Sequence, residues 1–207
     1  MRLLTPLLLL LSFSCSALSQ STELKGVGRF ETLDNPWFLV ALYGETNQQD
    51  KLVADKRELK VVEEKVSVRR FRQLWQDVFA VGADRDQWHS HSDDLSRFLE
   101  LTRGPLKADD FMVFERIGRD VVVSINYREH SRLSAEFLDV LVSTLTGRIA
   151  PIPQLRDGLL GLLPDSEQAQ LQRQFSSREP TLGRISETGR WLRKARHRQD
   201  EAQVSQL

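Results

Sequence analysis

The sequence predicts an α+β fold in which helices cover one side of a mainly antiparallel sheet. Two observations carry this prediction. Apolar residues run without interruption or alternate with a period of two at 26–43, 57–64 and 111–127, whereas they recur every three or four residues at 68–79 and 134–147. The order along the chain is therefore strands, two helices, a hairpin and two helices, which is typical of this fold class.

The first two strands are expected at 26–33 and 37–43, joined by a turn at Asp34-Asn35-Pro36. The second of these segments is apolar throughout, which is typical of a short strand buried on both faces. The polar stretch 45–56 is expected to be a loop, and a third strand is expected at 57–64 because apolar residues return there.

A change of apolar period then predicts helices. The first is expected from Val68, with Ser67 as its N-cap, and is expected to end at Gly82. Its apolar face consists of Val68, Phe71, Leu74, Trp75, Val78 and Phe79. A second helix is expected at about 93–102, stopped by Gly104-Pro105.

A hairpin is expected from the paired segments 111–117 and 121–127, the second of which alternates apolar and polar residues. A third helix is expected to start after Ser134, whose hydroxyl can cap it, and to end at Gly147. Leucines recurring over 155–163 predict a short fourth helix.

The N-terminus predicts a secretion signal over residues 1–19. Arg2 supplies one positive charge, an apolar run from Leu7 to Leu11 follows, and small residues lead to cleavage after Ser19. The run is shorter than the about 20 apolar residues that span a bilayer. An uncleaved anchor and a lipoprotein acylated at Cys15 are the alternatives. A cleaved signal predicts a periplasmic or secreted protein.

The rest of the chain is expected to form one domain over 20–163, followed by a polar tail over 164–207 that is partly helical or disordered. Cys15 is the only cysteine and lies within the signal, so the mature chain has no disulfide and no thiolate zinc site. Lys and Arg number 29, as do Asp and Glu, and this balance argues against a nucleic-acid binder.

Two motifs favour structural interpretations over chemical ones. Gly26 and Gly28 lack the pattern of a phosphate loop and indicate close backbone packing. His89, His91 and Asp93 belong to the densest group of metal-ligand side chains, but they stand where a helix begins, so that an acid serves more simply as a cap. We therefore expect no metal and no cofactor.

A basic cluster near the C-terminus flanks Trp191. Its members are Arg190, Arg193, Lys194, Arg196 and Arg198. This cluster would suit a peripheral contact with anionic lipid or an envelope protein. The alternative is a solvated charged tail, because Asp200 and Glu201 follow directly.

The residues together resemble the bacterial chalcone isomerase-like family of secreted proteins. Four stretches carry the resemblance, which covers about residues 25–163: Gly26–Phe30 with Trp37–Tyr43, Leu59–Trp75, Leu106–Asn126, and Phe137–Gly147 with Leu155–Gly161. The resemblance implies an open-faced β-sandwich with a ligand cleft between the sheet and the helices. Catalytic members of the family close a chalcone into a flavanone, and fatty-acid-binding relatives hold a carboxylate with an apolar tail in the same cleft.

The resemblance also implies the site residues. Arg29 matches the arginine that meets the anionic end of the ligand, although on the sequence alone its side chain points either into the cleft or outward. Phe38 and Phe71 fall where catalytic members carry a threonine and a tyrosine, so the hydroxyl pair that stabilises an oxyanion is missing. Tyr43 is the fourth expected ligand-binding residue.

The first hypothesis is therefore a periplasmic, non-catalytic protein that binds a small apolar carboxylate such as a fatty acid, or a polyphenol, beside Arg29. One alternative is an intramolecular lyase of the chalcone isomerase type that uses Tyr43 or Tyr127 instead. The other is an envelope interaction module that acts through its basic tail. Whether the protein is an enzyme stays open at this point.

Overall fold

The computed structural model describes residues 23–46, 52–83 and 85–192, and the expected signal lies outside them. The strands are β1 (Leu24–Thr32), β2 (Asn35–Thr46), β3 (Leu52–Val61), β4 (Lys65–Val66), β5 (Leu106–Lys107), β6 (Phe111–Ile117), β7 (Asp120–Ile125) and β8 (Arg128–Ser134). The helices are α1 (Val68–Gly82), α2 (Arg85–Ser90), α3 (Ser92–Leu99), α4 (Ala135–Thr146), α5 (Pro153–Leu159), α6 (Asp165–Ser176) and a last helix over 182–192.

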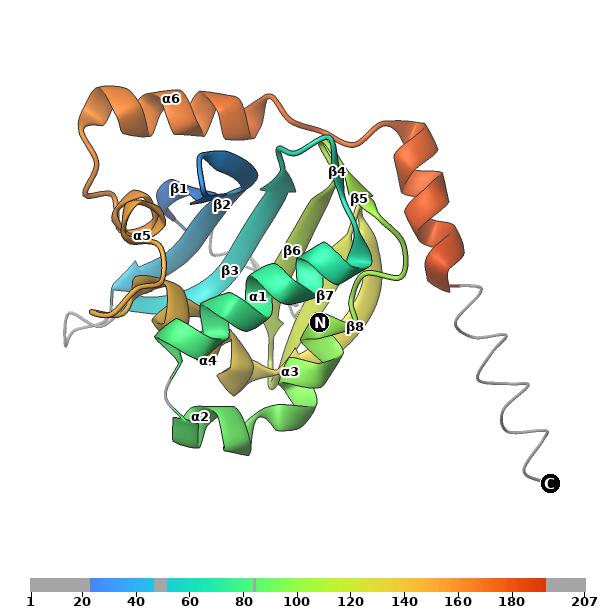
Figure 1. The fold of residues 1–207 in the computed structure, drawn as a ribbon, viewed down its shortest axis with the longest axis horizontal. Helices are drawn as coiled ribbons and strands as arrows, with labels where there is room; N and C mark the ends of the chain where they lie inside the picture. The colour runs from blue at the N-terminus through green and yellow to red at the C-terminus, as the bar shows by residue number, and fades with distance from the viewer. Residues whose placement is uncertain (1–22, 47–51, 84, 193–207) are drawn as a thin grey trace, which may run out of the picture.

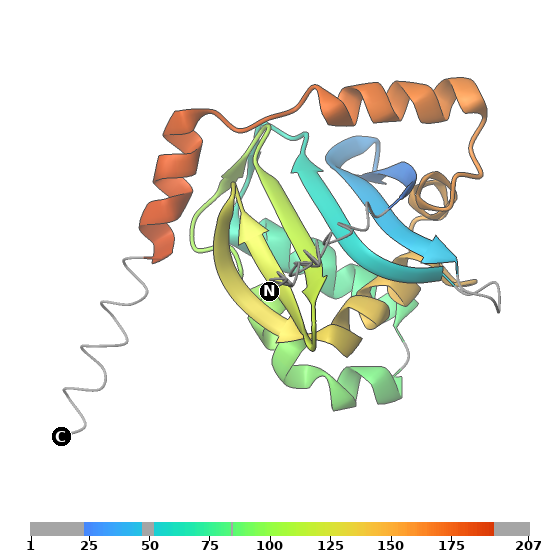
Figure 2. The ribbon, with the colours of Figure 1, turned by 180° about the vertical axis from the view of Figure 1, so that it is seen from behind.

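Within the described residues, six strands form one antiparallel sheet in the order β1-β2-β3-β6-β7-β8. Helices α1, α3, α4 and α5 cover its inner face, and α6 lies across β1 and β2 on the outer face (Figures 1 and 2). The α+β class and the open sheet covered by helices are therefore confirmed. None of the described helices combines the length and hydrophobicity of a membrane span.

Local signals placed the long helices correctly. The Ser67 hydroxyl accepts from the backbone N–H of Arg70 at 3.1 Å, and α1 ends at Gly82 as predicted. Ser134 caps α4 in the same way, and Gly147 ends that helix. These caps satisfy backbone groups that would otherwise lack partners at the helix ends.

The prediction of a loop at 45–56 is wrong for most of this segment. Strand β2 continues to Thr46, and β3 begins at Leu52. Ala54 is buried and pairs with Gly44, whereas Val53 pairs with Glu45 and is partly exposed. The segment looked like a loop because its polar side chains face outward, while its backbone is held by the ladder between the two strands.

The two glycines of β1 confirm the prediction of close backbone packing. A Cβ atom at Gly26 would lie 2.1 Å from the carbonyl oxygen of Gly158, and one at Gly28 would lie 2.4 Å from that of Leu155. Both partners belong to α5. This helix therefore contacts the backbone of β1 directly, which only glycine permits.

Aromatic rings fill the space between the sheet and the helices. Phe98 of α3 lies at the centre of this aromatic core, and its ring centroid is 5.0–5.9 Å from five other rings. Those rings belong to Phe71, Trp75, Phe79, Phe114 and Phe137. Close edge and tilted contacts of this kind add to the stabilisation from burial itself.

The segment expected as a polar tail is integral to the fold up to residue 192. Leu171 and Phe175 of α6 pack against outward-facing Val27, Leu39 and Ala41 of the sheet. The helix 182–192 docks on the other side of the molecule, at the end of the sheet near β5 and β8 (Figure 1). The chain on the two sides of residue 163, the expected end of the domain, therefore packs into one structure.

Candidate functional site

The four residues expected to bind ligand lie on opposite faces of the sheet. Arg29 pairs in register with Leu39, which faces α6, so the Arg29 side chain is on the outer face. It is 42% exposed and lies 3.6 Å from Glu31. Arg29 therefore does not reach a cleft between the sheet and the covering helices, and its expected role at the polar end of such a cleft needs correction.

Phe38 and Phe71 lie on the inner face and are buried. Their ring centroids are 6.4 Å apart in an edge-on arrangement, and Phe30 packs against Phe38 at 5.5 Å. The rings fill the place where the resemblance puts a hydroxyl pair. Their contacts explain the two phenylalanines as core residues.

The two tyrosines also lie away from the inner face. Tyr43 pairs with Lys56 on the outer face, and its hydroxyl donates to the Glu58 carboxylate at 3.1 Å. Burial and Glu58 raise the pKa of Tyr43. Tyr127 is exposed and donates to Glu179 at 2.5 Å, and this hydrogen bond raises its pKa. A raised pKa keeps both phenols protonated, which is unfavourable for a catalytic base.

An arginine that the sequence analysis overlooked does occupy the inner face. Arg57 of β3 is 0% exposed and pairs in register with Leu42 and Phe114, both members of the apolar core. Its Nη1 donates to the carbonyl oxygen of Leu141 in α4 at 3.0 Å. Arg57 thus lies between the sheet and the helical layer, where Arg29 was expected to lie.

The hydrogen-bonding capacity of the Arg57 guanidinium is only partly used. Its Nε and Nη2 are buried and have no hydrogen-bond partner, and no carboxylate among the described residues pairs with it. Burial lowers its pKa to about 9. A charge at this depth is destabilising unless it meets an anion, because water no longer solvates it. A signal was present in the sequence, since Arg57 precedes Leu59 and Val61 at the strand period of two.

The acids of the group weighed as metal ligands lie in the first turn of α3, and the cap position is taken by His91 without a side-chain hydrogen bond, so the prediction of an acidic cap is wrong. His91 is the residue before α3, and Asp94 within that helix is buried. The Asp94 carboxylate accepts from the Ser134 hydroxyl at 2.5 Å, which ties α3 to the start of α4. In the described part of the chain, no three His, Cys, Asp or Glu side chains gather as a metal site would require.

The last helix is held by a buried ion pair. Asp110 is completely buried and accepts from Arg184 Nε at 3.0 Å and from Asn126 at 2.8 Å. Trp191 packs on Gly104 and is buried, so its ring is not free to enter a membrane. Of the predicted basic cluster, Arg190 is described, and the residues beyond 192 lie outside the described range.

No protein-family model matches the chain, and no curated protein is significantly similar to it. The resemblance to the chalcone isomerase-like family therefore stays a prediction.

Proposed function

We propose that this protein is an exported, non-catalytic binding protein that holds a small apolar anion, such as a fatty acid, against Arg57. The observation that carries the proposal is the fully buried guanidinium with two unpartnered nitrogen atoms. A carboxylate can accept from two nitrogens of one guanidinium at once. Such a ligand would supply the charge and the acceptors that the described residues do not.

The surroundings of Arg57 suit the apolar part of such a ligand. Leu42 and Phe114 flank it on the neighbouring strands, and α4 lies over it. Pockets for small molecules are mostly apolar with a few placed polar groups. Because Arg57 is completely covered, binding would require α4 to separate from β3, and the opening would break the hydrogen bond from Arg57 to Leu141.

The residues also support a binding role over an isomerase role. Phe38 and Phe71 bring no hydroxyl to the inner face, and the hydroxyls of Tyr43 and Tyr127 are held by carboxylates elsewhere. Stabilisation of an oxyanion by preorganised donors would then rest on Arg57 alone. The predicted secretion signal supports a location for this binding role in the periplasm or outside the cell.

The test is a comparison of two arginine variants. Purified wild type, Arg57→Met and Arg29→Ala are analysed for retained small molecules by native and denaturing mass spectrometry, and each is titrated with dodecanoate. We expect wild type and Arg29→Ala to bind dodecanoate alike, and Arg57→Met to lose binding while remaining folded. Equal binding by all three proteins, or no binding by wild type, would rule out the proposal.

A further inference from the structure

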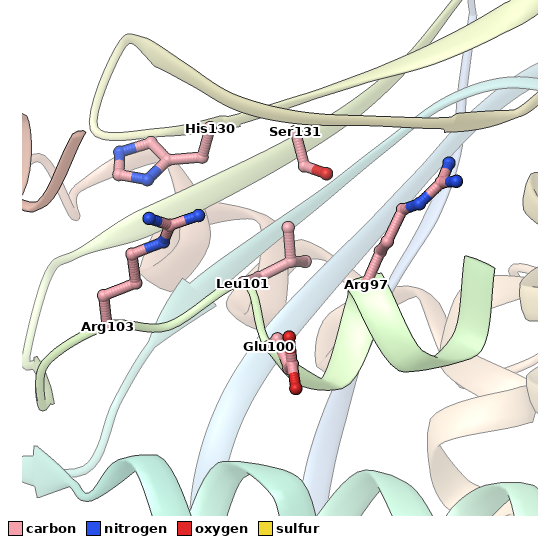
Figure 3. Close-up of a pocket in the computed structure, with 6 residues that line it drawn as sticks. All are labelled: Arg97, Glu100, Leu101, Arg103, His130 and Ser131. Atoms are coloured by element: carbon pink, nitrogen blue, oxygen red, sulfur yellow. The ribbon is translucent and has the colours of Figure 1, made fainter. Parts of the chain in front are cut away.

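A small pocket lies between the end of α3, the segment that follows this helix, and β8 (Figure 3). It is lined by Arg97, Glu100, Leu101, Arg103, His130 and Ser131. Its volume of about 90 Å³ exceeds the roughly 10–15 Å³ that one water molecule requires. It is far smaller than the roughly 300–1,000 Å³ of pockets for larger organic ligands. The size therefore suits a small ion.

One of the two arginines that line the pocket has no partner among the described residues. Arg103 is exposed and has no hydrogen bond or ion pair with any described residue. Arg97 lies 3.6 Å from Asp94, whose carboxylate already accepts from Ser134. Glu100 brings one negative charge, but Figure 3 shows it across the pocket from His130 and Ser131. Among the residues that line the pocket, the Arg103 guanidinium is thus the cation available to an anion.

A bulge in the sheet brings a histidine to the pocket. Ser124 pairs with Glu129 and Val123 with Ser131, so His130 is the extra residue of β8 without a partner in the ladder. Both ring nitrogens of His130 are buried and have no hydrogen-bond partner. A neutral imidazole has one N–H donor and one acceptor, and leaving both unpaired is unfavourable. Burial and the charge of Arg103 lower the pKa of His130 to about 4, so the ring is neutral at pH 7.

We propose that this pocket binds a small oxyanion, the carboxylate or phosphate group of a solute, at Arg103 beside His130. The Ser131 hydroxyl and the His130 N–H are the neutral donors at the wall formed by β8. Charge-assisted hydrogen bonds from guanidinium groups are the stronger contacts, and the neutral donors add direction. This site is separate from Arg57 and does not depend on the binding role assigned to that residue.

The experiment titrates the full protein at pH 7 and constant ionic strength with inorganic phosphate and, separately, with acetate. Binding is followed through the NMR signals of the Ser131 amide and the His130 ring. We expect saturation by at least one anion, at least about tenfold weaker binding by Arg103→Ala, and unchanged binding by Arg173→Ala. Arg173 is an exposed arginine on α6, and it serves as the matched control.

The outcomes separate the sources of the ligand group. Saturation by phosphate alone assigns a phosphate group, and saturation by acetate alone assigns a carboxylate. Ser131→Ala, which removes only a hydroxyl, is expected to weaken binding severalfold without unfolding the protein. No saturation by either anion, or equal weakening in Arg103→Ala and Arg173→Ala, would overturn the site.

Discussion

Replacement of Arg57 by methionine should make the protein more stable, although most core substitutions destabilise. Methionine is unbranched and flexible, and it can occupy the volume of the arginine stem between Leu42 and Phe114. The substitution removes a buried charge and two nitrogens without partners, and it loses one hydrogen bond to Leu141. The balance therefore favours the variant.

The expected change in the free energy of unfolding follows from the same contacts. Replacing buried ionic groups by apolar ones of similar volume stabilises proteins by about 1–4 kcal/mol in favourable cases. The lost hydrogen bond offsets about 1 kcal/mol of this. We expect a net gain of about 0–3 kcal/mol in the free energy of unfolding, which corresponds to about 2–4 °C in Tm per kcal/mol for a chain of this length.

The assay is urea unfolding followed by fluorescence, for which the buried Trp75 is a suitable probe. Arg116→Met is the matched control. Arg116 donates to the carbonyl oxygen of Ala135 at 3.1 Å and pairs with Asp139 at 2.7 Å, so the same substitution should lower stability by about 1–3 kcal/mol. If Arg57→Met were destabilised as much as the control, the interpretation of Arg57 as an uncompensated charge would be refuted.

Three further predictions test the fold and the pocket. Asp110→Asn should lower the free energy of unfolding by about 1.5–3 kcal/mol, because Arg184 keeps the carboxylate of Glu187 at 2.6 Å but loses that of the buried Asp110; an unchanged free energy of unfolding in urea would contradict this. Gly28→Ala should cost about 1–3 kcal/mol, since its Cβ would lie 2.4 Å from a backbone oxygen of α5, whereas Gly189→Ala, with open space around it, should be neutral or stabilising in the same assay. Between pH 7 and pH 4.5, wild type should lose about 1–2 kcal/mol more of its free energy of unfolding than His130→Gln does. The reason is that the pKa of His130 is lowered in the folded protein, so the unfolded chain binds a proton at a higher pH than the folded protein does. If the two proteins lost stability in parallel over this pH range, His130 would not be the cause.

The elements that the sequence predicted best are those whose signals are local. The period of α1 and the hydroxyls of Ser67 and Ser134 act within a few residues of the helix that they define. Each is visible without knowledge of the partner surface. The caps and helix ends at Gly82 and Gly147 therefore agree with the structure.

The elements that were missed depend on distant partners. Strand β8 is polar along most of its length and is held by its ladder with β7 at the edge of the sheet. Helix α6 has only two buried apolar residues, and it is stabilised by the outer face of β1 and β2. Neither the edge position nor the exposed apolar face of the sheet can be read from the local pattern.

The prediction of the ligand-binding residues has the same limitation, as Arg29 and Arg57 illustrate. The pattern placed Arg29 on a strand but left open which face it occupies, and the contact of Gly28 with α5 decides that Arg29 faces outward. The side-chain period in β3 would have put Arg57 on the same face as Leu59.

The buried arginines Arg184 and Arg57 differ in whether a carboxylate of the described chain pairs with them. Arg184 meets the carboxylate of Asp110 and fixes the last helix, so its burial is explained by the fold alone. Arg57 meets one carbonyl oxygen and nothing acidic among the described residues. A fold selected only for stability would replace Arg57 by an apolar residue, as many cores tolerate. The proposed ligand would supply the missing partner, which makes Arg57 rather than Arg29 the residue on which the binding hypothesis depends.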